Sequence, residues 1–332
     1  MKLKKARLRA RILCGLAILL AKVFVSPGIA QEPKTKIRIS NSAISVTSLA
    51  LLAARDWKLF YERGLDPEII LMSPALTVPA MISGEIDYFA GVGPGVASAS
   101  LSGLPFRAVW VSSDRVSYSL MAHSKFKTIQ ELKGKKIGVT GSLGATNHVS
   151  LVIALEKLGI SPREFNILAL PPQEMLRSLE SGFLDAASLN PPTLFMAQKK
   201  GFANILDIGS LVEMPGGGLT VLAKDIKGKP DEVKRVIRAM QSAKDLMKKS
   251  KEKSLELMRR ILKMDQESAA STYEVFLKTL SPDGIPTRAG MENLVKSIQA
   301  QGRFTDKKPV FSDLADDRLA TEVAKELGYK LP

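Results

Sequence analysis

Cysteine and histidine, the side chains that most often bind transition metals or act as nucleophile and base, are scarce in this chain of 332 residues. The only cysteine is Cys14, so the sequence beyond it can form neither a disulfide bond nor a thiolate metal site. The two histidines, His123 and His148, lie far apart and lack the spacing of a metal motif. A Gly-x-Ser-x-Gly elbow is also absent. We therefore expect no metal, no cofactor and no enzymatic activity.

Aromatic residues are few as well: they form 6% of the chain, with 5 Tyr and 2 Trp. An aromatic cage for an ammonium ligand is therefore not expected. The formal net charge is +15, of which +8 remains after residue 30. Much of this excess lies on expected helices without interleaved aromatic residues, which favours a solvated helix face and argues against a nucleic-acid partner. The basic residues concerned are Lys244, Lys248, Lys249, Lys251, Lys253, Arg259, Arg260 and Lys263.

Long apolar runs are limited to the amino-terminal end, where basic residues precede an apolar run at 12–25 and small residues follow it. This order is typical of a cleaved secretory signal peptide, which we place at 1–30. The run is shorter than the about 20 residues that a membrane span needs, and Lys22 interrupts it. An uncleaved anchor is the alternative. Because Cys14 follows Leu13, where a lipoprotein site has a small residue, no lipid attachment is expected.

Two similar segments, 81–90 and 178–187, place their matching glycines and aspartates 98 residues apart. In each, a glycine suited to a helix end precedes an aspartate that opens a short apolar strand, and a proline-marked loop follows. The aspartates, Asp87 and Asp185, could be read as paired catalytic carboxylates, but stabilisation of the two turns is the better explanation. The repeat predicts two α/β lobes of similar plan.

Strands alternate with helices in both halves of the chain, which predicts mostly parallel sheets with helices on both faces. From Pro230 onward the sequence is mainly helical, and its apolar rows are expected to pack on the first lobe. Two extended segments, 118–123 and 218–224, connect the blocks. One connection out and one back would make a hinge between the lobes.

Four loops at the expected carboxyl ends of strands are candidates for a binding site, because ligands of open α/β sheets bind there. They are rich in Gly, Ser, Thr, Asn or Pro, and each leads into an expected helix, whose first N–H groups favour negative charge. Ordinary helix capping is the alternative for each loop. His148 and Arg115 are further candidates, with a partly buried polar residue as the alternative for His148. The loops are 41–47, 91–95, 140–146 and 188–193.

These features together resemble the periplasmic substrate-binding proteins of nitrate, sulfonate and taurine ABC transporters, a group that includes relatives of the thiamine-pyrimidine precursor synthase. The similarity extends over essentially the whole chain after the signal. The cysteine-rich motif of the precursor synthase is absent, which counts against that enzymatic chemistry. The resemblance is carried by the export signal, the segment 57–65, the two Ser-Gly-x-x-Asp turns, the segment 132–139 and the segment 171–187.

The resemblance implies a two-lobe, type II Venus-flytrap fold with two hinge crossings. Lobe 1 would comprise 36–117 plus 225–332, lobe 2 would comprise 124–217, and 118–123 and 218–224 would be the hinge strands. Binding positions of the family that match this sequence are Ser42, Ala43, Ser45, Gly93, Pro94, Ser142, Gly144, Ala145, Thr146 and Asn190.

The expected function is that of a monomeric periplasmic receptor that captures a small organic anion by lobe closure. A sulfonate, a carboxylate or a nitrate-like ion fits the loops, and the partner would be an ABC permease in the inner membrane. Two alternatives stay open. One is an enzyme that acts on a pyrimidine or thiamine precursor in the same cleft, and the other is a periplasmic ligand sensor.

Overall fold

The computed structural model describes residues 34–331. Its contacts divide the chain into two units, Met1–Lys34 and Thr35–Pro332, and the second unit contains all the elements discussed below. The signal peptide expected at 1–30 lies outside the described residues. Among residues 34–331, no helix combines the length and apolar character needed to cross a membrane.

The first of two five-stranded sheets has the strand order β2-β1-β3-β10-β4. β1 pairs in parallel with β2 and β3, whereas β10 runs antiparallel to both β3 and β4. The sheet is therefore mixed, with its parallel part formed by the first strands of the chain. Its strands are β1 (Thr35–Asn41), β2 (Leu65–Leu71), β3 (Tyr88–Phe89), β4 (Phe106–Arg115) and β10 (Glu213–Leu222).

The second sheet repeats this plan in the order β7-β6-β8-β5-β9. β6 is parallel to β7 and β8, and β5 is antiparallel to β8 and β9. In each sheet, the antiparallel inner strand arrives from the other sheet along the chain. The strands are β5 (Ser119–Ala122), β6 (Lys136–Thr140), β7 (Asn166–Leu170), β8 (Ala186–Leu189) and β9 (Ala203–Asp207).

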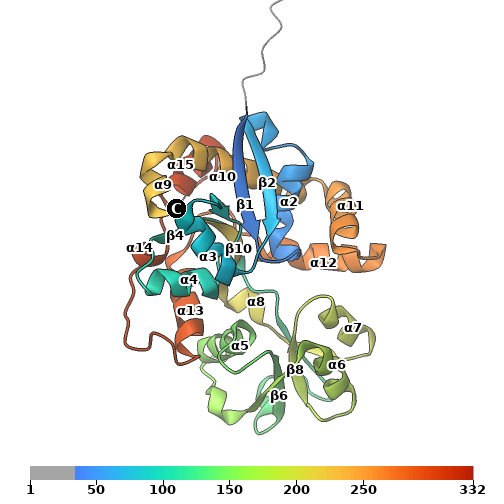
Figure 1. Cartoon of the computed structure of the whole chain (residues 1–332). Coiled ribbons are helices and arrows are strands. Elements are labelled where there is room, and N and C mark those ends of the chain that lie inside the picture. The colour runs from blue at the N-terminus through green and yellow to red at the C-terminus, as the bar shows by residue number, and fades with distance from the viewer. Residues whose placement is uncertain (1–33, 332) are drawn as a thin grey trace, which may run out of the picture. The chain divides into compact units, whose positions relative to one another are not determined.

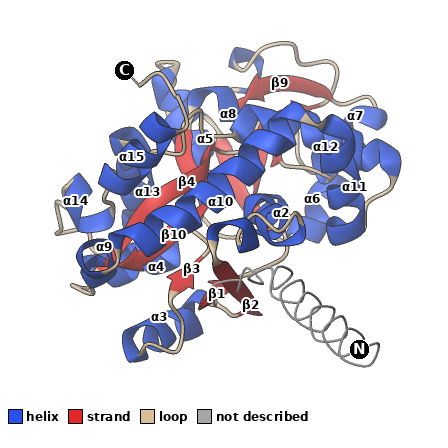
Figure 2. Cartoon of the chain, turned by 90° about the horizontal axis from the view of Figure 1, so that it is seen from above, coloured by secondary structure: helices blue, strands red, loops and turns tan. Residues whose placement is uncertain are grey.

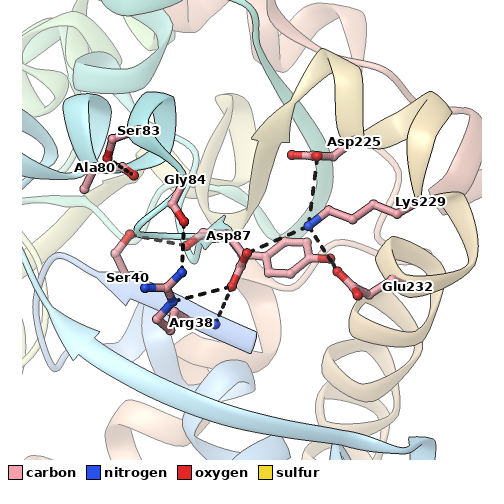
Figure 3. Close-up of polar contacts among 10 residues, drawn as sticks. Arg38, Ser40, Ala80, Ser83, Gly84, Asp87, Asp225, Lys229 and Glu232 are labelled. Atoms are coloured by element: carbon pink, nitrogen blue, oxygen red, sulfur yellow. Dashed lines mark hydrogen bonds and ion pairs between the residues drawn. The ribbon is translucent and has the colours of Figure 1, made fainter. Parts of the chain in front are cut away.

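The predicted internal repeat is confirmed at the level of single hydrogen bonds. Asp87 Oδ2 accepts the backbone N–H of Arg38 at 2.8 Å, and Asp185 Oδ2 accepts that of Lys136 at 3.1 Å. Figure 3 shows the first of these turns, where Lys229 Nζ also lies 3.9 Å from Asp87 Oδ1. Both carboxylates thus tie the start of a strand to its parallel neighbour. These bonds give both aspartates a structural role next to the turns.

Helices cover both faces of the first sheet. The largest apolar cluster joins one face to α2, α10, α11, α12 and α15, and smaller clusters join the other face to α3, α4, α13 and α14. α10 runs across the sheet (Figure 2). These helices are α2 (Leu49–Asp56), α3 (Pro74–Ser83), α4 (Pro94–Leu101), α9 (Ala223–Gly228), α10 (Pro230–Lys249), α11 (Lys251–Leu262), α12 (Gln266–Thr279), α13 (Arg288–Gln299), α14 (Phe311–Leu314) and α15 (Arg318–Glu326).

Fewer helices cover the two faces of the second sheet. α5 and α8 pack on one face, and α6 and α7 pack on the other. Short 3-10 turns occur in both halves. The helices and turns are α5 (Thr146–Lys157), α6 (Pro172–Glu180), α7 (Thr193–Lys199), α8 (Ile208–Leu211), η1 (Val46–Ser48), η2 (Tyr61–Arg63), η3 (Gln130–Leu132) and η4 (Pro162–Glu164). The elements therefore form two lobes, as expected, each with its own sheet (Figure 1).

The chain passes between the sheets at 116–118 and returns at residue 212. The segments expected to be hinge strands, 118–123 and 218–224, overlap β5 and β10, which pair within the sheets. The described pairings favour crossings a few residues to the amino-terminal side of both segments. The lobe bounds themselves stay a prediction.

One basic residue departs from the predicted solvated helix face. Lys244 is 0% exposed, its Nζ donates to Ser281 O at 2.7 Å, and it lies 5.9 Å from the ring centre of Trp110. The cause is helical spacing, because Lys244 follows Met240 by four positions and precedes Met247 by three on the buried face of α10. Burial lowers the pKa of Lys244 to about 8.

This burial gives Lys244 a measurable effect on stability. Below about pH 8 the ammonium is charged in the folded and unfolded chain, so its burial costs free energy. Between about pH 8 and the ordinary pKa of 10.5 the folded chain loses the proton first, so stability rises with pH. Urea unfolding at a series of pH values should show that the free energy of unfolding of wild type, relative to that of Lys244→Met, increases across this window. The expected increase is on the order of 3 kcal/mol. Parallel pH profiles for the two proteins would contradict this account.

Candidate functional site

A cavity of about 870 Å³ lies between the two lobes. Its walls come from the loops that follow β1 and β8, from both crossings between the sheets, from the first residue of α5, and from the α11–α12 segment. The cavity therefore occupies the place expected for a ligand of open α/β sheets, beyond the carboxyl ends of parallel strands.

The turn after β1 supplies hydroxyl groups to the cavity. Ser45 Oγ and Thr47 Oγ1 both line it and lie 2.9 Å apart. A reciprocal pair of bonds fixes the turn, in which Ser45 N donates to Ser48 Oγ at 3.0 Å and Ser48 Oγ donates to Ser45 O at 2.8 Å. The two hydroxyls are thus held in place before any ligand arrives.

Glycines of β10 allow this turn to approach the crossing strands. A Cβ on Gly217 would lie 2.4 Å from Thr47 O, and one on Gly218 would lie 2.2 Å from Trp110 O. Only glycine leaves room for backbone at these distances. The run Gly216 to Gly218 therefore has a packing role that places the Ser45–Thr47 turn against the crossing.

The second lobe faces this turn with Thr146 and Asn190, which both line the cavity. Thr146 is the first residue of α5, and Asn190 follows β8 directly. A third polar residue of this lobe is engaged elsewhere: His148 Nδ1 accepts the backbone N–H of Gly144 at 2.9 Å. Burial lowers the pKa of His148, which favours the neutral ring that this acceptor role requires.

Arg115 stands at the end of β4, where the chain leaves the first sheet. Its Nη1 donates to Ser210 O at 3.1 Å, and its Nη2 lies 3.8 Å from Glu213 Oε1. The side chain is 36% exposed and lines the cavity. Part of its charge is therefore balanced by Glu213, and the remainder is available to an anion in the cleft.

Four of the twelve residues singled out from the sequence line the cavity together: Ser45, Arg115, Thr146 and Asn190. The remaining eight, although all described, are not among the lining residues of this cavity. Contact with a ligand stays a prediction for every one of the twelve. The eight are Ser42, Ala43, Gly93, Pro94, Ser142, Gly144, Ala145 and His148.

Sequence reasoning missed the apolar wall of the cleft. Ile261, Leu262 and Met264 at the end of α11, with Val275 and Phe276 of α12, line the cavity. Their spacing indicates core packing, and they do pack on a core. Phe276 belongs to the main cluster of the first lobe, and Val275 packs against the smaller of two clusters in the second lobe. Lys263, with φ of 53°, forms the turn between the two helices, and no sequence pattern marks this turn.

Two pairs of residues bridge the lobes on either side of the cleft. Gln301 Nε2, just beyond α13, donates to Gly144 O at 3.2 Å. Lys199 Nζ of α7 lies 2.7 Å from Glu267 Oε1 of α12. In Figure 1, α13 approaches α5 and α12 approaches the second lobe accordingly. The lobes are thus in contact at both ends of the cavity.

Hydroxyl-bearing and apolar side chains make up most of the lining of the cleft. Within the described part of the chain, no group of three or more His, Cys, Asp or Glu side chains is placed to hold a metal ion. The lining includes a single carboxylate, that of Asp265, beside the basic Arg115 and Lys263. The arrangement can bind and orient a molecule through hydroxyls, an amide, a guanidinium and apolar surface.

The sequence profile of one family matches residues 46–254, which is more than half of the chain. The chain belongs to the NMT1/THI5-like family. A relative from Bacillus subtilis, named for binding aliphatic sulfonates, is 23% identical over 329 residues, covering 94% of this chain and 97% of the relative. This family membership agrees with the resemblance inferred from the sequence.

Solved structures of this type share the two-lobe fold. The periplasmic aliphatic sulphonate binding protein SsuA from Escherichia coli aligns with a TM-score of 0.67 at 18% identity, covering 84% of this chain and 96% of that one. The desulfurization enzyme DSZB, in a cysteine-to-serine variant with biphenyl-2-sulfinic acid, aligns with a TM-score of 0.57 at 13% identity, covering 88% and 99%. The fold therefore carries both a binding protein and an enzyme.

Gly144 offers a test of the contact between the lobes. Its φ is +87°, and a Cβ would lie 2.8 Å from Ala300 O, so Gly144→Ala should push α13 and the second lobe apart. Gly141→Ala is the matched control: its φ is +89°, but the nearest atom to its Cβ, Ala145 Cβ, is 3.7 Å away. Both variants carry the same left-handed strain of about 1–2 kcal/mol.

X-ray scattering of the ligand-free proteins should give a larger radius of gyration for Gly144→Ala than for Gly141→Ala. Equal radii would mean that the Gly144–Gln301 contact does not hold the lobes together in solution.

Proposed function

We propose that this protein is the solute-binding receptor of an ABC importer, which captures a small organic anion between its lobes and delivers it to a membrane permease. The observation that carries the proposal is the cavity of about 870 Å³ whose walls come from both lobes. A ligand held by both walls favours lobe closure by its differential affinity for the closed form. The sulfonate-binding relative and the SsuA fold support the ligand class.

The anionic ligand is favoured by the groups around the cleft. Hydroxyls of Ser45, Thr47 and Thr146 and the amide of Asn190 can donate hydrogen bonds, and Arg115 supplies a cation. The twelve-residue helix α5 begins at Thr146, so its unpaired N–H groups face the same region. An organic sulfonate or carboxylate satisfies these donors.

Export to the periplasm belongs to the same proposal. The predicted signal peptide at 1–30 and the periplasmic SsuA fold support it. The proposal also includes a permease as the partner and a receptor that acts as a monomer.

A catalytic role like that of DSZB is the second candidate, because that enzyme shares the fold. A thiol nucleophile is excluded by the sequence, since no cysteine follows Cys14. We therefore propose a protein that binds its ligand and releases it unchanged.

Isothermal calorimetry on residues 31–332, refolded after denaturation to remove bound ligand, tests the function. Nitrate, sulfonates and carboxylates form the panel, and at least one organic anion should give heat and raise the melting temperature, as a ligand specific for the folded state does. Recovery of the ligand unchanged after long incubation is expected. Absence of heat and of any thermal shift across the whole panel would contradict the proposal.

Arg115→Gln should weaken binding of such an anion by about tenfold or more, because hydrogen bonds to charged groups contribute about 1.5–3 kcal/mol. Arg163→Gln is the matched control, since Arg163 is exposed on the second lobe and does not line the cavity. Equal dissociation constants for the two variants would place the anion away from Arg115.

A further inference from the structure

A groove of about 450 Å³ lies on the first lobe, apart from the cleft. One of its walls is α13, and the other is the segment 307–314, which leads into α14 (Figure 1). Its described lining residues are all different from those of the cavity between the lobes. This α13 groove is therefore a separate feature of the surface, to which the proposed function assigns no role.

The rim of the groove is basic. Arg288, Lys296, Lys307 and Lys308 line it, with Glu292 as the one carboxylate among the described lining residues. Among residues 34–331, Arg288, Lys296 and Lys308 have no carboxylate partner within ion-pair distance. A hollow that holds four cations and one acid has a positive potential and attracts negative charge.

The floor of the groove is apolar. Met291 and Leu314 are 2% and 5% exposed and belong to a core cluster of the first lobe, so the core holds them in place. Val310 also lines the groove and is 61% exposed, and the guanidinium of Arg288 lies 5.2 Å from the ring centre of Phe311. A single exposed valine is ordinary on a protein surface. Together with the floor and the basic rim, it forms the apolar centre and polar margin that are typical of protein interfaces.

Hydrogen bonds fix the segment that follows α13. Gln299 Nε2 donates to Phe304 O at 3.0 Å and to Lys307 O at 2.9 Å. Val310 N donates to Asp313 Oδ2 at 2.9 Å, so this acid is engaged at the start of α14. The groove is therefore formed before any partner arrives, and binding there would order little chain.

Three kinds of occupant match these features poorly. A small anion would meet the cations but leave the apolar floor in water. A flat lipid surface would touch the rim without reaching the floor. The amino-terminal segment 1–33 has seven basic residues and one acid, so the rim would repel it. A stretch of another protein, with carboxylates beside an apolar side chain, meets both the rim and the floor.

We propose that the α13 groove is a docking site for an acidic segment of a partner protein. Carboxylates of this segment pair with Arg288, Lys296 and Lys308, and an apolar side chain of the segment lies between Val310 and the floor. The inference concerns a surface outside the cleft and does not depend on which ligand the cleft binds.

A fluorescently labelled peptide with four acidic residues around a central Leu-Phe pair tests the rim by anisotropy titration at low salt. The double variant Lys296→Glu with Lys308→Glu should bind this peptide about tenfold more weakly than wild type, because two attractions become repulsions. The matched control is Lys248→Glu with Lys249→Glu, since these lysines are exposed on α10 outside the groove and their reversal changes the net charge equally. Thermal melts of both variants check that each is folded.

Val310→Ser tests the apolar part of the site. Val310 directly precedes α14, and serine is a favoured residue at the start of a helix, so the variant should keep the local fold. It should weaken binding of the peptide by at least about threefold. Leu71→Ser is the matched control, because Leu71 is 60% exposed on β2 and does not line the groove. A peptide with serines in place of the Leu-Phe pair should bind wild type and Val310→Ser equally.

Several results would overturn the proposal. No binding of the acidic peptide at millimolar concentrations, or the same loss of affinity in both lysine pairs, would show that the groove is not a docking site for acidic segments. Equal binding of a peptide with Gln in place of each acid would remove the role of charge. Binding to phosphatidylglycerol vesicles that requires Lys296 and Lys308, without binding of the peptide, would assign the groove to a lipid surface. A dimer in sedimentation experiments that the same double variant abolishes would assign it to a second copy of the chain.

Discussion

The close approach of the two crossing strands is the constraint on which the cleft depends. β4 and β10 pair antiparallel from Phe106↔Leu222 to Arg115↔Glu213, and the chain leaves and re-enters the first sheet at that end. Gly216 to Gly218 allow backbone to lie where any side chain would collide, against Thr47 O on one side and Trp110 O on the other. This packing brings the β1 turn, Arg115 and the second lobe around one cavity. Larger residues at these positions would separate the walls and disperse the donors.

The two lobes have the same arrangement of strands but differ in the helices that follow it. Each has three parallel strands, an antiparallel strand from the other lobe, and an aspartate that ties one strand start to its neighbour. Only the first lobe continues into the helices from α10 onward, and α11 and α12 reach the cleft from there. The repeated part and the added helices each supply both polar and apolar side chains to the cavity. The walls of the cavity therefore include a part of the chain that the repeat does not contain.

Much of the fold could be predicted because its signals are local. The Ser-Gly-x-x-Asp turns revealed the repeat, and the alternation of strands and helices indicated two sheets. Strands β1 and β6, each followed by a helix and a parallel strand, are parts of this alternation. Strand β9 gives a weaker signal, because 203–207 is short and only partly buried.

The site was harder to predict, because burial and contact across the cleft depend on residues distant in sequence. The loops singled out by composition include Ser45, Thr146 and Asn190, which line the cavity, and also Gly93, which faces a small cavity of about 10 Å³ within the first lobe. Met264 and Phe276 carry the same periodic pattern as core residues, and only the tertiary structure shows that they also face the cleft. Lys244 is the converse case. Its charge led to the prediction of a solvated position, although its spacing along the helix is that of a core residue, and the side chain is buried.

Closure of the two walls on an organic anion is the central claim, and the distance between the lobes tests it most directly. Cysteines introduced at the exposed positions Lys253 and Arg163 can carry spin labels without interference, since no cysteine occurs after Cys14. Pulsed electron resonance on residues 31–332 should show a longer or broader distance distribution without ligand, and a single shorter distance at saturation with a bound sulfonate or carboxylate. An identical distribution with and without a ligand that calorimetry shows to be bound would contradict the account.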